Sequence, residues 1–319
     1  MCHGFDINTF DYSPTNYSIF MNWFSSQKVI VQGISEAEAA IYAVQMKAYG
    51  TEVVAGVSIG RGGTMIEDIP VFDLVEQVLT IVEKIDVSLI FVPPYQVLDA
   101  AREAIDLGIE RVIILTSDIP PQDTIKLIKY AEVNNTLLLG PGSQGITIPD
   151  RVWLGKLEPQ FYRSGNIGLI ASSKYLSYEI AAELNRFDLG ESMVVSLGQE
   201  SIIGSNLSQW LSILNQDPNT EAIVYAGQRI SDVEEVIYFC QNRDLDKPLV
   251  VYLIGLKTPQ ERMFRDAATI IGNHLSASIP AVNQERRIIN QLKKAGVQVA
   301  KRPWEIPSLL LDVCQQEVT

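Results

Sequence analysis

The sequence predicts an α/β protein with two domains, each built on a parallel sheet covered by helices. Short runs of β-branched residues alternate with segments of helical length and helical apolar spacing, which is typical of parallel strands joined by helices. The strand segments contain continuous apolar runs, as in sheets that are buried on both faces. The alternation stops at residues 140–164 and then resumes, and a chain of 319 residues is long enough to bury two cores.

The first domain begins with a strand and a helix and continues in the same order. Apolar runs predict strands at residues 28–33, 52–57, 88–92, 111–115 and 136–139. Helical spacing predicts helices at residues 35–49, 73–84, 97–107 and 122–133. Short turns join these elements, as is usual in such units.

A bridge rich in glycine and proline is expected at residues 140–164, before the second domain. There the predicted strands are residues 166–171, 193–197, 221–225, 248–254 and 297–300. The predicted helices are residues 177–187, 205–215, 232–242, 259–267 and 283–294.

The charge and the metal-binding residues exclude several classes of function. The net charge is −13, from 38 acidic and 25 basic residues, so the chain lacks the basic face that nucleic acids require. A local site for an anionic ligand stays open, since one helix N-terminus or one arginine can bind phosphate. Cys2, Cys240 and Cys314 form no CxxC motif, which indicates reduced thiols. With His3 and His274 the only histidines, no metal site is predicted.

Residues 1–27 are polar and aromatic, with neither the basic start nor the apolar core of a signal peptide. No segment of the sequence reaches the ~20 apolar residues that span a bilayer. We therefore expect a cytoplasmic protein without a membrane partner. The first 27 residues are interpreted as an arm, either free or packed by its aromatic side chains on a partner.

Ligands bind doubly wound sheets at the carboxyl ends of the strands, which in the first domain carry two informative loops. The first, after residue 33, has one glycine instead of a dinucleotide-binding GxGxxG, so an NAD site is not expected. Ser35 followed by Glu38 predicts a capping box at the start of the helix. The second loop, residues 58–63, reads SIGRGG, in which glycines allow close backbone approach and Arg61 suits a phosphate. It could equally be a surface turn.

A rigid edge is predicted at Pro93 and Pro94, directly after a buried strand. It could flank an adenine ring or a pantetheine arm, or simply end the strand.

Taken together, these stretches resemble the α subunits of succinyl-CoA synthetases, a family that includes the matching part of ATP-citrate lyase. The resemblance is carried in order by VIVQGISEAEAA, QMKAYGTEVVAGVSIGRGG, FVPPYQVLDAAREAIDLGI, GPGSQGITIP, SGNIGLIASSKYLSYE, IIGSNLSQWLSIL and KKAGVQVAKRPWEIPSLL. After the N-terminal arm at residues 1–27, it implies a Rossmann-like coenzyme A (CoA)-binding domain at 28–150 and a flavodoxin-like domain at 151–319. It also implies a β-type partner subunit, which would carry the nucleotide and Mg²⁺.

The resemblance also assigns residues. The CoA-contact loop falls on Ser35, Glu36, Ala37 and Glu38, whose two acids stand where the coenzyme's phosphates are expected. The family's phosphate-contacting lysine falls on Arg61, beside Gly62 and Gly63, and a second stretch of CoA contacts falls on Leu115, Thr116 and Ser117. Pro93, at the rigid edge described above, is a further candidate CoA contact. A substrate-pocket tyrosine falls on Tyr178. The turn Gly204, Ser205 and Asn206 would offer free N–H groups to an anion, or would serve as an ordinary helix cap.

The departures from the family pattern gather at its chemistry. Asp266, within Arg265-Asp266-Ala267, occupies the position of the phosphate-accepting histidine, and Gln228 that of the glutamate which orients it. Ser173-Lys174-Tyr175 replaces the small residues of a phosphate-binding helix start. An aspartyl phosphate at Asp266, or phosphate transfer through His274, would be an alternative route.

Three hypotheses follow. The chain is a CoA- or acyl-CoA-binding regulatory subunit without the phosphohistidine step, an active acyl-CoA ligase subunit with an altered phosphate route, or a structural assembly partner. The expected ligand is CoA or an acyl-CoA, and the expected protein partner is a β-type subunit or another copy of the chain.

Overall fold

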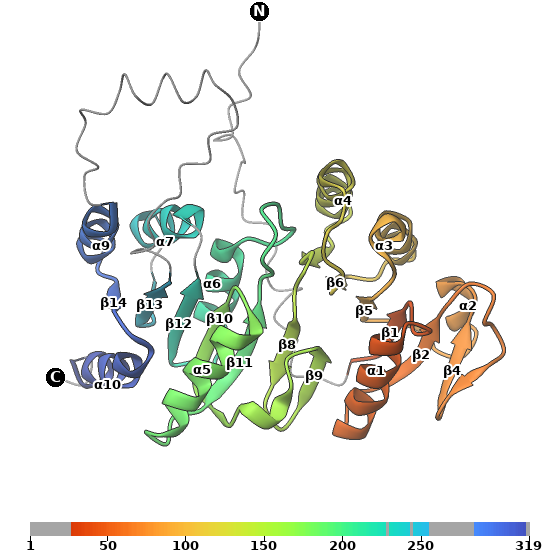
Figure 1. Ribbon diagram of the computed structural model, residues 1–319, viewed down its shortest axis with the longest axis horizontal. Helices are drawn as coiled ribbons and strands as arrows, with labels where there is room; N and C mark the ends of the chain where they lie inside the picture. Colours follow the sequence, from red (N-terminus) through yellow and green to blue (C-terminus); the bar gives the residue numbers. More distant parts are fainter. Residues whose placement is uncertain (1–26, 228–229, 243–244, 255–283, 317–319) are drawn as a thin grey trace, which may run out of the picture.

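The computed structural model describes residues 27–227, 230–242, 245–254 and 284–316 of the chain. The side chains of residues 230, 231, 242, 284–286 and 313–316 also lie outside this description. Two sheets stand side by side, with helices on both faces of each (Figure 1). The α/β architecture with two mainly parallel sheets is therefore confirmed.

The first sheet has the strand order β3-β4-β2-β1-β5-β6-β7. All its pairs are parallel except β3 with β4. The strands are β1 Val29–Gln32, β2 Val53–Val57, β3 Met65–Ile66, β4 Ile69–Phe72, β5 Val87–Ile90, β6 Arg111–Ile114 and β7 Leu137–Leu139. The chain crosses from one side of β1 to the other between β4 and β5, so loops from both halves meet at the carboxyl end of β1.

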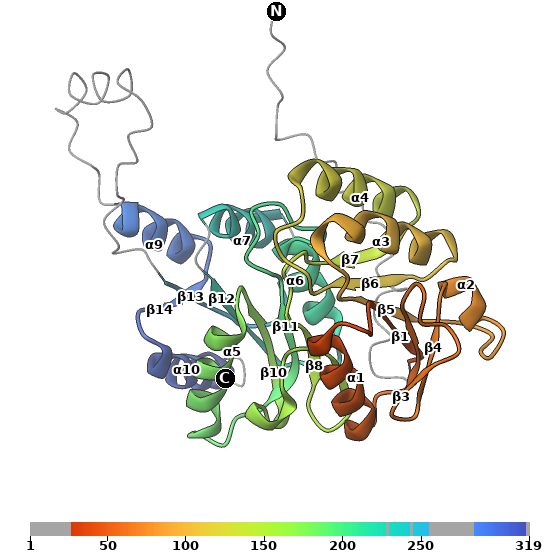
Figure 2. The ribbon, with the colours of Figure 1, turned by 45° about the vertical axis from the view of Figure 1, so that its right-hand side comes forward.

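Helices bury both faces of this sheet because its strands are apolar at consecutive positions. Val29 and Val31 pack on α1, whereas Ile30 faces the helices on the other side. Those helices are α2 Val75–Val78, α3 Val97–Asp106 and α4 Pro121–Val133; α1 is Ala37–Tyr49, and the 3₁₀ turn η2 is Pro94–Gln96. In Figure 2, α1 lies below the sheet and α3 and α4 lie above it.

The helix predicted at residues 73–84 is much shorter than expected, since only Val75–Val78 is α-helical. The following residues form tight turns, in which the N–H groups of Thr80 and Ile81 bond three residues back. Val75 and Val78 are buried in the core, but Leu79 and Ile81 after them remain exposed, so burial supports only the first turn of this segment. Without such burial a short helix gains little stability.

The second sheet has the order β14-β13-β12-β10-β11-β8-β9. Its strands are β8 Gly145–Ile148, β9 Val152–Gly155, β10 Ser164–Ala171, β11 Glu191–Ser196, β12 Ala222–Gly227, β13 Leu249–Leu253 and β14 Gln298–Ala300. The prediction of a bridge without strands at residues 140–164 was wrong for β8 and β9, which form an antiparallel hairpin, and β8 pairs antiparallel to β11. Their edge position explains this, since a hairpin needs no helical crossover.

Two groups of helices cover the second sheet. One face carries α6 Leu207–Gln216, α7 Ile230–Asn242 and α9 Gln284–Lys294; the other carries α5 Lys174–Asn185 and α10 Ile306–Gln316. The 3₁₀ turns η3 Pro159–Phe161 and η4 Pro303–Glu305 precede β10 and α10. The helix predicted at residues 259–267 lies outside the described residues. Within the described part of the chain, no helix is long and apolar enough to cross a bilayer.

The two sheets share one continuous core through the β8–β9 hairpin. Trp153, on β9, is buried and contacts the rings of Tyr42 and Tyr49 of α1 edge-on, with centroids 6.0 and 6.1 Å apart. The hydroxyl of Thr51 donates to the Trp153 carbonyl oxygen (2.9 Å) and accepts the Trp153 N–H (3.1 Å). These contacts fix the hairpin against α1, and so fix the second sheet beside the first.

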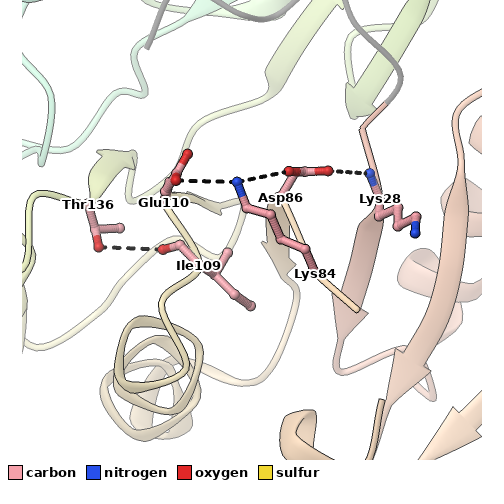
Figure 3. A network of polar contacts seen from close by, with 6 residues as sticks. All are labelled: Lys28, Lys84, Asp86, Ile109, Glu110 and Thr136. Carbon is pink, nitrogen blue, oxygen red and sulfur yellow. Dashed lines mark hydrogen bonds and ion pairs between the residues drawn. The ribbon is translucent and has the colours of Figure 1, made fainter. Parts of the chain in front are cut away.

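A polar network ties together the amino ends of the first sheet's strands, opposite the predicted ligand loops (Figure 3). Asp86 accepts the backbone N–H of Lys28 at 2.9 Å, joining the starts of β1 and β5. Lys84 reaches both Asp86 (3.5 Å) and Glu110 (3.3 Å), which adds the start of β6. Each surface ion pair of this kind contributes little to the stability of the fold. We therefore infer that the network mainly keeps the strands aligned.

Candidate functional site

The candidate site lies at the carboxyl ends of the first sheet, where four loops come together with residues from the second. Ser35 follows β1 and Ser58 follows β2, and their hydroxyl oxygens are 2.7 Å apart. This contact brings residues 35–38 beside the glycine loop 58–63. The side chains of both loops are largely exposed, so they are accessible to a ligand.

Helix α1 begins here without a side-chain cap. Its N-cap is Glu36, whose side chain makes no capping hydrogen bond. The predicted capping box of Ser35 and Glu38 was therefore wrong: the Ser35 hydroxyl faces Ser58, and Glu38 faces Lys156. Both side chains found tertiary partners that local spacing could not reveal. The uncapped first-turn N–H groups leave a partial positive charge at this end of α1.

The N–H groups of the glycine loop point inward, to the carboxylate of Asp73. Asp73 Oδ1 accepts the backbone N–H groups of Gly60 (2.7 Å), Arg61 (3.1 Å) and Gly62 (2.9 Å). These bonds, led by those from Gly62 and Gly60, lower the pKa of Asp73. Asp73 thus occupies the anion-binding concavity that such a loop forms.

The side chain of Arg61 is what this loop presents to solvent. Arg61 is exposed, and the described residues show no ion-pair partner for its guanidinium. The α positions of Gly60 and Gly63 face open space, since an added Cβ atom would meet nothing within 4 Å. The loop therefore combines a fixed backbone, an open surface and a cation free to bind an anion.

The floor of the site consists of β5 and β6 and the residues after them. The Thr116 hydroxyl donates to the carbonyl oxygen of Val92 at 2.7 Å, which fixes Pro93 beside the end of β6. Leu115 is buried, whereas Ser117 and Pro93 are exposed. Of the predicted CoA contacts on this floor, Ser117 and Pro93 therefore offer accessible surface.

The second sheet closes the site from two sides. The Glu200 carboxylate accepts the backbone N–H of Asp118 at 3.0 Å, at the end of β6. On the other side, the Lys156 ammonium lies 2.6 Å from Glu38 Oε2 and 5.4 Å from the centre of the Phe91 ring. Only 14% of the Lys156 side chain is exposed, against 57% for Glu38.

Tyr178 lies beside Lys156, on α5. Its hydroxyl accepts the Glu158 N–H (3.2 Å) and donates to the Lys156 carbonyl oxygen (3.4 Å). Its ring stacks on Phe161 with centroids 4.2 Å apart. Burial raises the pKa of Tyr178 to about 12, so the phenol stays protonated at neutral pH. With both hydrogen-bonding functions of its hydroxyl in use, Tyr178 forms a wall of the site.

The turn at Gly204, Ser205 and Asn206 lies at the far side, where the Gly204 N–H donates to Gly140 (2.7 Å). Asn206 and Gln209 form a capping box at the start of α6. The backbone N–H of Ser208, in the first turn of α6, donates to the Glu235 carboxylate at 3.2 Å. The Ser205 hydroxyl accepts the Trp210 indole N–H at 2.9 Å. These are the contacts of a capped helix whose N–H groups at 208 and 209 are taken.

The start of α5 differs from a small-residue phosphate site. The Ser173 hydroxyl accepts the Leu176 N–H at 3.4 Å, and Tyr175 next to it is 74% exposed. Asp266, Gln228 and His274 lie outside the described residues. Within the described ranges, no cluster of His, Cys, Asp and Glu side chains has the makings of a metal site.

Sequence reasoning missed two residues of the candidate site, Asp73 and Lys156. Asp73 follows a predicted loop and looks like an ordinary helix start, although an acid after a strand and near a glycine loop is a usable hint. Lys156 meets Glu38 across 118 positions of sequence. Only the docking of the β8–β9 hairpin on α1 brings these two charges together.

Comparison with known proteins matches both halves of the chain. Residues 24–117 match the CoA binding domain family, and residues 164–276 match the succinyl-CoA ligase-like flavodoxin domain family. The chain is 33% identical over 286 residues to subunit alpha 2 of an ADP-forming succinate–CoA ligase from Archaeoglobus fulgidus, covering 90% of this chain and 96% of that protein. It is 35% identical over 282 residues to the alpha subunit from Aquifex aeolicus, covering 88% and 90%.

Solved structures support the same fold. The chain superposes on ATP citrate lyase from Methanothrix soehngenii, in complex with citrate and coenzyme A, with a TM-score of 0.73 at 15% identity. That match covers 94% of this chain, which spans 52% of the lyase chain. A dinucleotide-forming acetyl-coenzyme A synthetase 1 from Ca. Korarchaeum cryptofilum matches with a TM-score of 0.65 at 21% identity, over 88% of this chain and 59% of its own.

Proposed function

Because the chain belongs to the family of succinate–CoA ligase α subunits, we propose that it binds CoA or an acyl-CoA at the carboxyl ends of its first sheet. The observation that carries this proposal is the Ser35–Ser58 contact, which sets the uncapped start of α1 beside Arg61. Backbone N–H groups at a helix start and a guanidinium both bind phosphate. CoA carries phosphate groups, which such a combination would bind.

The residues present include groups that can bind the phosphates of the coenzyme, and also two carboxylates that oppose its negative charge. The N–H groups of residues 37 and 38 and the side chain of Arg61 would hold phosphates, and Ser117 and Pro93 would border the remainder. The coenzyme itself supplies the thiol that carries an acyl group. Glu36 and Glu38 place two carboxylates at the same helix start, which disfavours anions unless one of them is neutralised.

We further propose that the chain acts without a phosphohistidine, as a regulatory subunit beside a β-type partner or another copy of itself. Asp266 at the family's histidine position supports this, because a carboxylate cannot form the phosphorylated imidazole. The contacts of α6 support it too, since the N–H groups of Ser208 and Gln209 already donate to Glu235 and Asn206. Nucleotide and Mg²⁺ would then lie on the partner.

Calorimetric titration with CoA tests the proposal. Wild-type protein should bind CoA with a millimolar or tighter Kd, and Arg61→Ala should weaken binding about tenfold, as expected for loss of a charge-assisted contact to phosphate. Lys129→Ala, which removes an exposed charge on α4 away from the site, should leave the Kd unchanged. Absence of both binding heat and thermal stabilisation at millimolar CoA would contradict the proposal.

An active ligase is the second candidate, because the relatives match over nearly their whole length. In that case the chain, purified with its β-type partner, should form a thioester from CoA, succinate or a related acid, and a nucleoside triphosphate. A complex that binds CoA without forming a thioester would exclude this candidate and leave the regulatory one.

A further inference from the structure

We propose that Glu38 and Lys156 form an electrostatic gate on the CoA site. By this we mean that Lys156 is a second phosphate-binding cation, and that Glu38 pairs with it in the free protein and competes with the phosphate of the ligand. This inference rests on the proposed function, since it concerns the same site. It adds a residue from the second sheet to a site otherwise built from the first.

Lys156 is held in place rigidly. Its backbone N–H donates to the Gln144 carbonyl oxygen at 2.8 Å, and its carbonyl oxygen accepts the Tyr178 hydroxyl. Its side chain is largely buried, with the ammonium over the Phe91 ring. A lysine fixed in this way loses little further freedom when it binds a ligand.

The ammonium lies at an unfavourable place for a cation. Glu38 is in the first turn of α1, so the Lys156 charge stands near the positive end of the helix dipole. A cation there needs an anion beside it, and Glu38 supplies one at 2.6 Å. A phosphate at the same helix start would satisfy both the helix end and Lys156.

Glu38 is the member of the pair that can move. Its side chain is 57% exposed, so its carboxylate can swing into water at small cost, whereas Lys156 cannot leave. Glu158 contributes a second negative charge nearby. Burial raises the pKa of Tyr42 most, and the charges of Glu158 and Glu38 raise it further, so both carboxylates lie close to the same side chain. The resting site is thus negative on balance, and ligand binding must displace Glu38 from Lys156.

Two substitutions test the gate by calorimetry with CoA. Glu38→Gln removes the competing charge and should tighten CoA binding about threefold to tenfold, because Lys156 is then open to phosphate. Lys156→Met keeps an apolar stem beside Phe91 and should weaken binding about tenfold. Lys156→Arg, which keeps the charge, should restore part of the affinity.

A matched control lies at the other end of α1, where Lys47 pairs with Asp68 at 2.8 Å. Lys47→Met removes an ion pair from the same helix and should leave CoA affinity unchanged. Pantetheine, which has no phosphate, should bind the Lys156→Met and wild-type proteins equally. Equal weakening toward pantetheine and CoA would show that Lys156 only supports the structure, and would overturn the proposal.

The outcomes separate this inference from the proposed function. CoA binding to wild-type protein that is unchanged in Glu38→Gln and Lys156→Met overturns the gate and leaves CoA binding standing. Binding that is seen only with Glu38→Gln supports the gate. No binding to either wild-type or Glu38→Gln protein overturns both. If Lys156→Met does not fold, Glu38→Gln decides alone, and unchanged or weaker binding overturns the gate.

Discussion

The carboxylate of Asp73 accepts the backbone N–H of Gly60 at 2.7 Å, together with the next two N–H groups of the same loop. The glycine loop is therefore filled by an anion of the protein itself. A ligand at the proposed site would meet the Arg61 side chain, because the N–H groups of the loop already donate to Asp73. The loop's role in the proposed site is to hold Arg61 in place.

Replacing Asp73 with alanine should loosen this loop. Three N–H groups lose their common acceptor, so amide hydrogen exchange in residues 60–62 should accelerate and CoA affinity should fall about fivefold through loss of preorganisation. Asp73→Asn keeps an oxygen acceptor and should retain slow exchange. Exchange followed by mass spectrometry checks both variants, and equal protection in wild-type and Asp73→Ala protein would contradict this account.

Thr51→Val should destabilise the docking of the hairpin on α1. The substitution keeps the shape of the side chain but removes both hydrogen bonds to Trp153, leaving a buried N–H and C=O unpaired. Such groups cost about 1–3 kcal/mol each, and we expect a loss in this range in urea unfolding. Thr51→Ser keeps the hydroxyl and should lose less. Equal losses in the two variants would assign the effect to packing.

The stability of the fold should fall as the pH rises, because the carboxyl group of Glu191 is buried. Burial of the carboxyl group in β11 raises the pKa of Glu191 from its ordinary value of 4.5 to about 7. The folded state therefore holds a proton that the unfolded state releases, so stability should fall as the pH rises from about 4.5 to 7. This change in pKa corresponds to roughly 3.5 kcal/mol at most, since one pKa unit is about 1.4 kcal/mol.

Glu191→Gln should remove this pH dependence, and the variant should be more stable than wild type at pH 8 but not at pH 4.5. Urea unfolding across this range measures the effect. Glu221→Gln, at an exposed position, serves as the control and should keep the wild-type profile. A wild-type stability that stays level between pH 5 and pH 7.5 would show that Glu191 is charged in the folded protein.

Gly33→Ala should be more damaging than Gly108→Ala. Both glycines have positive φ, +84° and +78°, so both variants carry the strain of a left-handed alanine, about 1–2 kcal/mol. At Gly33 the new Cβ atom would also lie 2.7 Å from the backbone nitrogen of Val92, whereas at Gly108 it meets nothing within 4 Å. We expect a loss of about 3 kcal/mol or more for Gly33→Ala, by thermal or chemical unfolding. Similar losses of stability in both variants would show that backbone strain alone causes the effect, without a contribution from the contact with Val92.

Local patterns predicted the strands well where burial is symmetrical. β1, β5 and β6 are buried at every position because helices cover both faces, and each contains two or three adjacent apolar residues, which gave a clear signal. The β8–β9 hairpin was missed because its residues lie among glycines and prolines that indicate a loop, and its pairing with β11 is a tertiary contact. The helix predicted at residues 73–84 is limited to Val75–Val78, since its later apolar residues Leu79 and Ile81 are exposed and meet no core.

The sequence by itself determined the α/β class, the family and the positions of the loops at the candidate site, because these depend on local periodicity and on motifs read in order. The tertiary structure alone decided how the charges pair: Asp73 with the N–H groups of Gly60, Arg61 and Gly62, and Lys156 with Glu38. Coulomb energy and hydrogen bonding depend on distance in space, and the packing of the hairpin on α1 sets that distance across 118 residues of chain.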